Sequence, residues 1–316
     1  MGTQSYPRIE DEKSKYHGYL DDSYLDEHKL VIKDSEIEKI IKNAIIMANK
    51  KSGRTILNVP SDMPEKDASE LYKKKGKELF QYFTKYYGDP ASSAYGCLHQ
   101  NYEKVAKEQF RNWTLQKERM NSGWRYQFIA KDGAIKSKRF VSVSDIGTAE
   151  ADFNAIIGVK NSNKTVSIYV SVKNRVNTMG GQDWPKAISA LEEVANKDKN
   201  RTGPYICVFG IAMDRGLRLI KKNSKTKAPF SVNTELWKSD YFWPFFTNLS
   251  YGKIIRSVLS VLIELGSETN KDIDIPQELI TSFGNECRKH KLLDSAGKFN
   301  DAYKLVEIFC EQKKHE

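Results

Sequence analysis

The sequence predicts an α/β protein, with a central β-sheet flanked by helices and with helical additions in the N- and C-terminal parts of the chain. The middle of the chain holds short apolar or alternating runs that are typical of strands, at residues 139–146, 151–159, 166–173 and 205–213. A helical pattern follows the third of these runs, and longer helical patterns precede and follow the whole region. A composition of 39% hydrophobic and 11% aromatic residues is that of a folded chain.

The N-terminal part, residues 1–123, is expected to be mainly helical and to pack on the core. Its helices are predicted over residues 35–53, 60–88 and 99–123. Ser35 and Glu38 have the spacing of a capping box, which marks the start of the first helix. Gly123 is expected to end the third helix.

Residues 124–220 are expected to form the α/β core, and residues 221–316 an aromatic-rich and helical C-terminal part. The aromatic run from Trp237 to Phe246 is expected to pack as a core layer under a helix. Because the chain has no internal repeat and no long Pro/Gly linker, we expect the three parts to form one compact unit.

Two consecutive strands of the predicted core carry polar residues that could act together. Side chains alternate along a strand, so in 166–173 the valines and Ile168 share one face while Ser171 and Lys173 share the other. The preceding strand opens with Asp152, and a short turn joins the two strands. We therefore expect an acid on one strand to meet a Ser-x-Lys on its neighbour.

A carboxylate binds a hard divalent cation through oxygen, and a cation beside an ammonium can lower the pKa of a bound water. Such an arrangement suits the hydrolysis of a phosphodiester. In Asp152 and Ser171-Val172-Lys173 the sequence resembles the PD-(D/E)xK nuclease superfamily, and within it the type II restriction endonucleases. Their core has an acid at the start of one strand and a (D/E)xK triplet at the end of the next.

The resemblance covers about residues 139–213 and implies a restriction-endonuclease-like central mixed β-sheet. It implies a Mg²⁺-dependent enzyme that hydrolyses phosphodiester bonds at specific sites in double-stranded DNA, acts as a homodimer, and has a cognate DNA methyltransferase in the same system. By the resemblance Asp152 binds the metal, while Lys173 orients or activates the attacking water and stabilises charge. Ser171 contributes a hydroxyl near the metal or simply leaves room.

The sequence departs from the family pattern at two positions. Ala151 stands where the family usually has proline, and Ser171 stands where it usually has a second acid. A subgroup of these enzymes with Ser-x-Lys takes its second acid from the following helix, which favours Glu192 as a catalytic residue and metal ligand. The competing candidates for this acid are Glu150, Glu193 and Glu108.

The formal charge of +10 implies an anionic partner, most simply nucleic acid phosphate. Residues 1–38 hold ten acids against five bases, a charge of −5, which leaves +15 for the remainder. Several basic and polar residues near the core strands are candidate DNA contacts: Lys136, Lys138, Arg139, Asn174, Arg175, Asn177, Thr178, Gln182, Lys221 and Lys222.

Other classes of function lack their motifs, because the sequence has no HExxH, no GxSxG elbow and no phosphate-binding Gly-rich loop. The alternatives that remain open are a DNA-binding protein that keeps a nuclease-like fold without catalysis, and a related nuclease acting on RNA or on modified DNA. The four cysteines show no CxxC pairing, and the sequence has no run of about 18 apolar residues and no signal-peptide core. We therefore expect a cytoplasmic protein with reduced thiols and no membrane partner.

Overall fold

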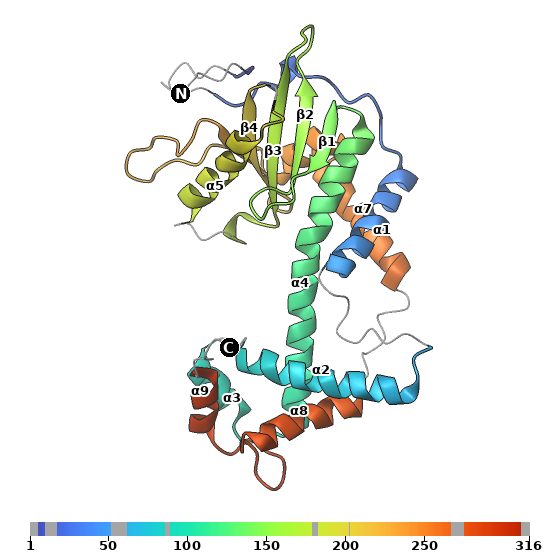
Figure 1. Cartoon of the computed structure of the whole chain (residues 1–316), viewed down its shortest axis with the longest axis vertical. Coiled ribbons are helices and arrows are strands. Elements are labelled where there is room, and N and C mark those ends of the chain that lie inside the picture. The colour runs from blue at the N-terminus through green and yellow to red at the C-terminus, as the bar shows by residue number, and fades with distance from the viewer. Residues whose placement is uncertain are drawn as a thin grey trace. The chain divides into compact units, whose positions relative to one another are not determined.

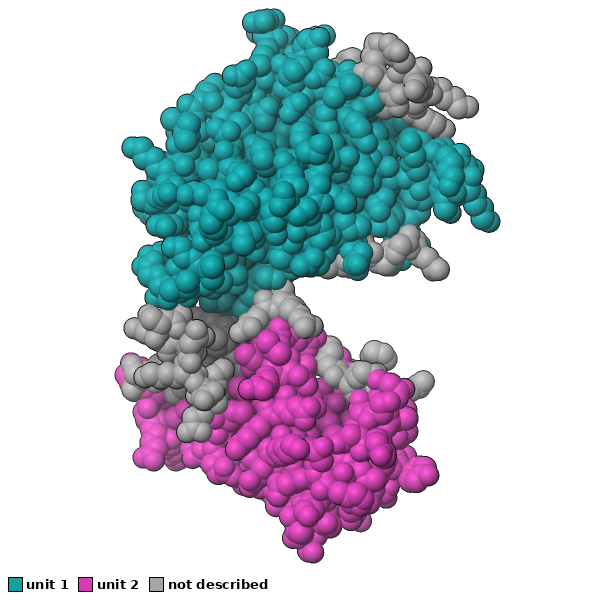
Figure 2. Space-filling model, turned by 180° about the vertical axis from the view of Figure 1, so that it is seen from behind, with its two compact units in different colours: residues 1–51, 121–267 teal, residues 52–120, 268–316 magenta. Residues whose placement is uncertain are grey.

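The computed structural model describes residues 6–9, 18–51, 62–85, 89–178, 183–201, 203–266 and 275–310. The chain forms two compact units, which Figure 2 shows in teal and magenta. Unit 1 comprises residues 1–51 and 121–267, and unit 2 comprises residues 52–120 and 268–316. This division differs from the single unit of three consecutive parts that the sequence suggested, because each unit combines an N-terminal segment with a C-terminal one.

The described part of unit 1 holds a six-stranded sheet in the order β1-β2-β3-β4-β6-β5. Figure 1 shows strands β1 to β4 side by side in this order. Its strands are β1 (Ser142–Asp145), β2 (Phe153–Gly158), β3 (Thr165–Lys173), β4 (Tyr205–Ile211), β5 (Arg218–Leu219) and β6 (Thr234–Trp237). The pairs β1/β2, β2/β3 and β5/β6 are antiparallel, while β3/β4 and β4/β6 are parallel. The predicted α/β class with a mixed sheet is confirmed.

Helices cover both faces of the sheet in unit 1. They are α1 (Asp34–Lys51), the C-terminal part of α4 (Tyr102–Ser137), α5 (Trp184–Lys197), α6 (Ser239–Thr247) and α7 (Tyr251–Gly266), with short 3-10 helices η1 (Asp22–Tyr24) and η2 (Val176–Thr178). Val166 and Val170 of β3 pack in the core shared with α1, α4, α6 and α7. Tyr169, on the opposite face, packs with Leu191 of α5. Strand alternation thus divides β3 between two apolar layers.

Helix α4 continues through Gly123, where the sequence predicted its end, as far as Ser137. A glycine inside a helix costs about 1 kcal/mol relative to alanine, which burial of neighbouring residues outweighs. Tyr126, Ile129 and Ala130 are all buried in the core of unit 1. Packing of this face therefore extends the helix past a local stop signal.

The aromatic segment around α6 is a core layer, as the sequence predicted. Trp237, Phe242 and Phe246 are fully buried. The centre of the Phe246 ring lies 5.9 Å from that of Trp237 and 5.2 Å from that of Phe242, in tilted contacts. Gly210 of β4 allows this packing, because a Cβ there would lie 2.2 Å from the Phe242 ring.

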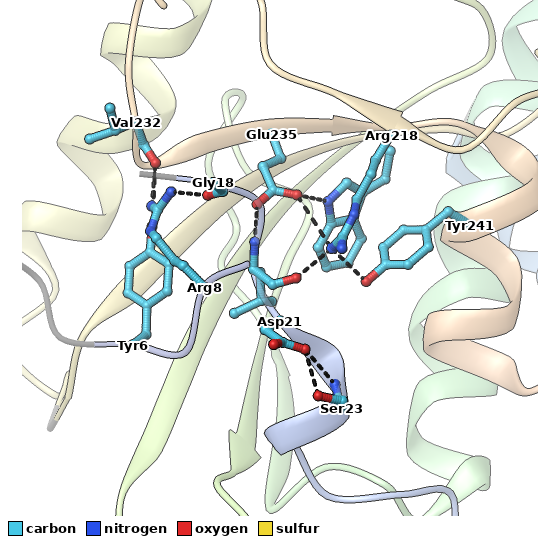
Figure 3. Close-up of polar contacts among 11 residues, drawn as sticks. Tyr6, Arg8, Gly18, Asp21, Ser23, Arg218, Val232, Glu235 and Tyr241 are labelled. Atoms are coloured by element: carbon cyan, nitrogen blue, oxygen red, sulfur yellow. Dashed lines mark hydrogen bonds and ion pairs between the residues drawn. The ribbon is translucent and has the colours of Figure 1, made fainter. Parts of the chain in front are cut away.

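A buried glutamate of β6, Glu235, is hydrogen-bonded to the N-terminal segment at Leu20 (Figure 3). Glu235 has no exposed surface, and its carboxylate accepts hydrogen bonds from the Leu20 N–H at 2.6 Å and the Trp237 indole at 2.7 Å. The Arg218 guanidinium lies 3.8 Å from the same carboxylate and donates to the Leu20 carbonyl and the Tyr241 hydroxyl. The buried charge therefore has hydrogen-bonding and ionic partners, as a stable buried carboxylate requires.

Unit 2 is helical in its described residues. It contains α2 (Glu65–Lys85), α3 (Pro90–Cys97), the N-terminal part of α4, α8 (Gln277–Lys289) and α9 (Ala302–Cys310). Helices α2 and α8 approach closely at Gly76, where a Cβ would lie 2.4 Å from the Leu279 carbonyl oxygen. The Ser282 hydroxyl donates to the Lys73 carbonyl across the same contact.

All four cysteines of the chain lie in described residues and are free thiols. Of the described helices, none combines the length and apolar character that crossing a bilayer requires.

Candidate active site

Asp152 directly precedes β2 and is held against β3. Its backbone N–H donates to the Val170 carbonyl at 2.8 Å, and its Oδ2 accepts the Val172 N–H at 2.6 Å. The antiparallel register, in which Phe153 opposes Val170, brings the start of β2 to the end of β3. The predicted meeting of Asp152 with the Ser-x-Lys strand is therefore present in the structure.

Asp152 and Lys173 line one cavity of about 520 Å³. The cavity lies where β2 begins and β3 ends. The rest of its wall comes from the C-terminal end of α1, from residues 124–131 of α4 and from the segment 145–151 that leads into β2. The further polar or aromatic residues that line it are Lys51, Trp124, Gln127, Phe128, Lys131, Asp145, Thr148 and Phe153. The space is large enough to admit part of a substrate next to the acid.

The charge of Asp152 is affected by burial and by two lysines. Burial raises the pKa of the Asp152 carboxyl above its ordinary value, while the Val172 N–H and the charges of Lys173 and Lys51 act in the opposite direction. Among the ion pairs of the described residues, none joins Asp152 to Lys173 or to Lys51. A buried carboxylate of this kind gains from a cation that enters beside it.

Ser171 is a buried strand residue, 1% exposed, and does not line the cavity. The resemblance allowed two roles for Ser171. Its buried position fits the role of a small residue that leaves room better than the role of a hydroxyl near the metal. Lys173, two residues further at the end of β3, reaches the cavity.

The structure does not bring Glu192 to Asp152, contrary to the expectation from the sequence. Its carboxylate accepts hydrogen bonds from the hydroxyls of Ser231 and Thr234, the latter at 2.6 Å. Thr234 lies on β6, and β3 and β4 separate that strand from β2. The side of α5 that carries Glu192 therefore faces the far half of the sheet.

The other candidate acids are not among the residues that line this cavity. Glu150 and Glu193 line a separate cavity of about 500 Å³, and Glu193 pairs with Lys197 at 2.6 Å. Glu108 belongs to unit 2. Within the residues that the structure describes, no three or more His, Cys, Asp or Glu side chains gather in a way that could hold a metal ion. Of the candidate acids named from the sequence, Asp152 is thus the one that lines the cavity with Lys173.

Several candidate DNA contacts have internal partners. Arg139 is only 7% exposed and donates to the carbonyls of Asp26 at 2.6 Å and Phe245 at 3.0 Å, so its role is structural and the sequence interpretation was wrong. Lys136 of α4 pairs with Glu36 of α1 at 2.5 Å. Lys138 is exposed, in a left-handed backbone conformation with φ of 54°.

The candidates around the end of β3 and after β5 are placed as follows. Asn174 donates to the Ser122 hydroxyl at 2.9 Å, and the exposed Arg175 pairs with Asp214 at 3.1 Å. The Lys221 ammonium lies 4.6 Å from the centre of the Trp184 ring. Lys222 forms an isolated β-bridge with Pro229. Asn177 is exposed, and Thr178 is the last residue of η2. Gln182 lies outside the described residues.

The sequence interpretation missed the residues that α1 and α4 bring to the cavity. Trp124, Gln127 and Lys131 follow the spacing of one helix face, and this spacing was visible in the sequence. Lys51 carries no such signal, because it is the last residue of α1 and only the tertiary fold brings it near Asp152.

Comparison with known protein families and with curated proteins gives no match for this chain.

Proposed function

We propose that this protein is a Mg²⁺-dependent endonuclease of the restriction-endonuclease-like fold, acting on double-stranded DNA. The observation that carries the proposal is the shared cavity of Asp152 and Lys173, at the adjoining ends of two antiparallel strands. An acid and an ammonium in this relation are the minimal groups for assisted phosphodiester hydrolysis.

The strand order supports the finer fold assignment. The antiparallel strands β1, β2 and β3 are followed by the crossover helix α5 and the parallel strand β4. The resemblance of the sequence to the PD-(D/E)xK nucleases implies the same succession of elements.

The donor set fits a weakly held Mg²⁺ ion. Mg²⁺ usually keeps several waters and is bound by one or two carboxylates plus substrate phosphate, so Asp152 would hold it together with the DNA backbone. When bound, the ion would supply positive charge beside the phosphate and lower the pKa of a coordinated water.

The protein's own groups would divide the remaining work. Asp152, fixed by the Val172 N–H, keeps its carboxylate aimed at one position. Lys173 is outside any ion pair of the described residues, and its ammonium would donate to the attacking water or to a phosphate oxygen. Attack of water on phosphorus then breaks one P–O bond and leaves a phosphate monoester and a hydroxyl.

Charge supports DNA as the substrate of unit 1. This unit holds 31 lysines and arginines against 22 acids, a formal charge of +9, whereas unit 2 holds 20 against 19, a charge of +1. The positive charge therefore accompanies the site. Cutting both strands of a symmetric site requires two active sites, so we propose a homodimer, with a cognate methyltransferase protecting the host DNA.

A second candidate is a DNA-binding protein without catalysis. It is favoured by the separation of Glu192, Glu150 and Glu193 from Asp152. The other carboxylate that lines the cavity, that of Asp145, is paired with Lys131.

The test is incubation of the purified chain with unmethylated phage DNA, in Mg²⁺ and in EDTA, with products separated on a gel. Discrete fragments that form only in Mg²⁺ are expected. Intact DNA that is retarded by the protein would support the second candidate, and parallel arms with RNA and with modified DNA would reveal a nuclease of different substrate class.

A further inference from the structure

Three lysines line the cavity of Asp152, and they differ in what neutralises them. Lys131 lies 3.0 and 2.8 Å from the two carboxylate oxygens of Asp145, so an acid already offsets its charge. Lys173 and Lys51 have no ion pair among the described residues. Two ammonium groups that form no ion pair within the described part of the chain therefore border the cavity, one from β3 and one from α1.

Lys51 is in contact with an aromatic ring. Its ammonium lies 3.5 Å from the centre of the Trp124 ring, which also lines the cavity. A cation–π contact at a partly exposed site is weaker than a charge-assisted hydrogen bond to a phosphate oxygen. A phosphate that reached this wall would compete successfully for the ammonium.

The position of Lys51 relative to Asp152 is also informative. Lys51, Lys173 and Asp152 line the same cavity, so both ammonium groups border the space beside that acid. A polynucleotide carries phosphates in succession, so a strand that holds one phosphate at Asp152 and Lys173 has a neighbouring phosphate to offer to a second cation.

We propose that Lys51 is a phosphate-binding residue of this site, and that its ammonium leaves the Trp124 ring to bind a DNA backbone phosphate next to the one at Asp152 and Lys173. This inference rests on the proposed function for the identity of the ligand. It assigns α1 to the DNA-contacting surface and makes Trp124 a reporter of binding.

The test measures binding of a short DNA duplex in EDTA, where hydrolysis is blocked, over a range of salt concentrations. Lys51→Gln should weaken binding about tenfold and reduce the slope of log K against log salt by about 0.9, the share of one phosphate contact in B-DNA. Lys51→Arg should keep the wild-type slope. Lys50→Gln, at the exposed preceding position of α1 and outside the cavity lining, is the matched control and should also keep it.

Tryptophan fluorescence gives a second readout. Saturating DNA should change the emission of the wild-type protein, and Trp124→Phe should remove most of that change. Equal salt slopes for Lys51→Gln and Lys50→Gln would overturn the inference. The proposed nuclease activity is tested separately. Absence of cleavage in Mg²⁺ would not change the conclusion drawn from these binding measurements. Equal salt slopes would overturn the role of Lys51 even if the protein cleaved DNA.

Discussion

The Asp152 carboxylate accepts a 2.6 Å hydrogen bond from the backbone N–H of Val172. Val172 stands between Ser171 and Lys173, so this bond ties the acid at the start of β2 to the strand end that carries the lysine. Backbone donors do not change rotamer, and the carboxylate is therefore oriented without help from another side chain. A preorganised acid of this kind is suited to hold a cation at a fixed place.

The position of Glu192 predicts that its removal has little effect on catalysis. Glu192→Gln should change the cleavage rate by less than about twofold, because hydrogen bonds to Ser231 and Thr234 hold this side chain on the far half of the sheet. The measurement is the initial rate of cleavage in Mg²⁺. A loss as large as that of Asp152→Asn would mean that α5 does supply the second acid.

Removal of the buried Glu235 is expected to destabilise unit 1 strongly. Glu235→Ala should lower the free energy of unfolding by about 3–5 kcal/mol, because it leaves Arg218 without its buried counter-charge and two donors without an acceptor. Urea unfolding followed by tryptophan fluorescence reports mainly on unit 1, which contains all the tryptophans except Trp113. Glu193→Ala, at a surface ion pair, is the control and should shift the curve little.

His28 is expected to make the stability of unit 1 depend on pH. Burial, followed by the charge of Arg139, lowers the pKa of the His28 imidazole from 6.5 to about 4. The unfolded chain binds a proton at His28 below about pH 6.5, but the folded chain does so only near pH 4, so stability falls as the pH drops through this window.

The check is a comparison of urea midpoints from pH 7 to pH 4 for the wild type and His28→Gln. In the structure Nε2 lies 2.9 Å from the Pro244 carbonyl oxygen, and a glutamine amide can donate in its place. The variant should lose less stability over this range. Parallel curves for the two proteins would show that His28 titrates normally in the folded state.

The close approach of α2 and α8 predicts opposite effects of two glycine substitutions in unit 2. Gly76→Ala should destabilise the unit by about 1–3 kcal/mol, because the new Cβ would lie 2.4 Å from the Leu279 carbonyl oxygen. Gly96→Ala, on α3 with nothing within 4 Å of its Cβ, should be neutral or stabilising by up to about 1 kcal/mol. Hydrogen exchange of peptides from α2 and α8 measures the stability of unit 2 in each variant. Similar exchange in the two variants would contradict the close packing of α2 on α8 at Gly76.

The sequence predicted the strands of the core well, because local alternation determines which side chains share a face. The helix that follows β3, and the meeting of Asp152 with the Lys173 strand, also followed from local pattern. The contribution of Lys51 did not, since only the packing of α1 brings that residue to the cavity. The choice of Glu192 was wrong for a similar reason. The order of strands in the sheet decides which strands the Glu192 side of α5 faces, and the order of elements along the chain does not reveal it.

We propose that Asp152 and Lys173 form one catalytic site. The most direct test is the initial rate of plasmid cleavage in Mg²⁺ by wild type, Asp152→Asn and Lys173→Gln, with Lys164→Gln in the exposed β2–β3 turn as the control. Losses of at least about 100-fold are expected for the two site variants, and an unchanged rate for the control. Cleavage by Asp152→Asn or Lys173→Gln at the wild-type rate would contradict it.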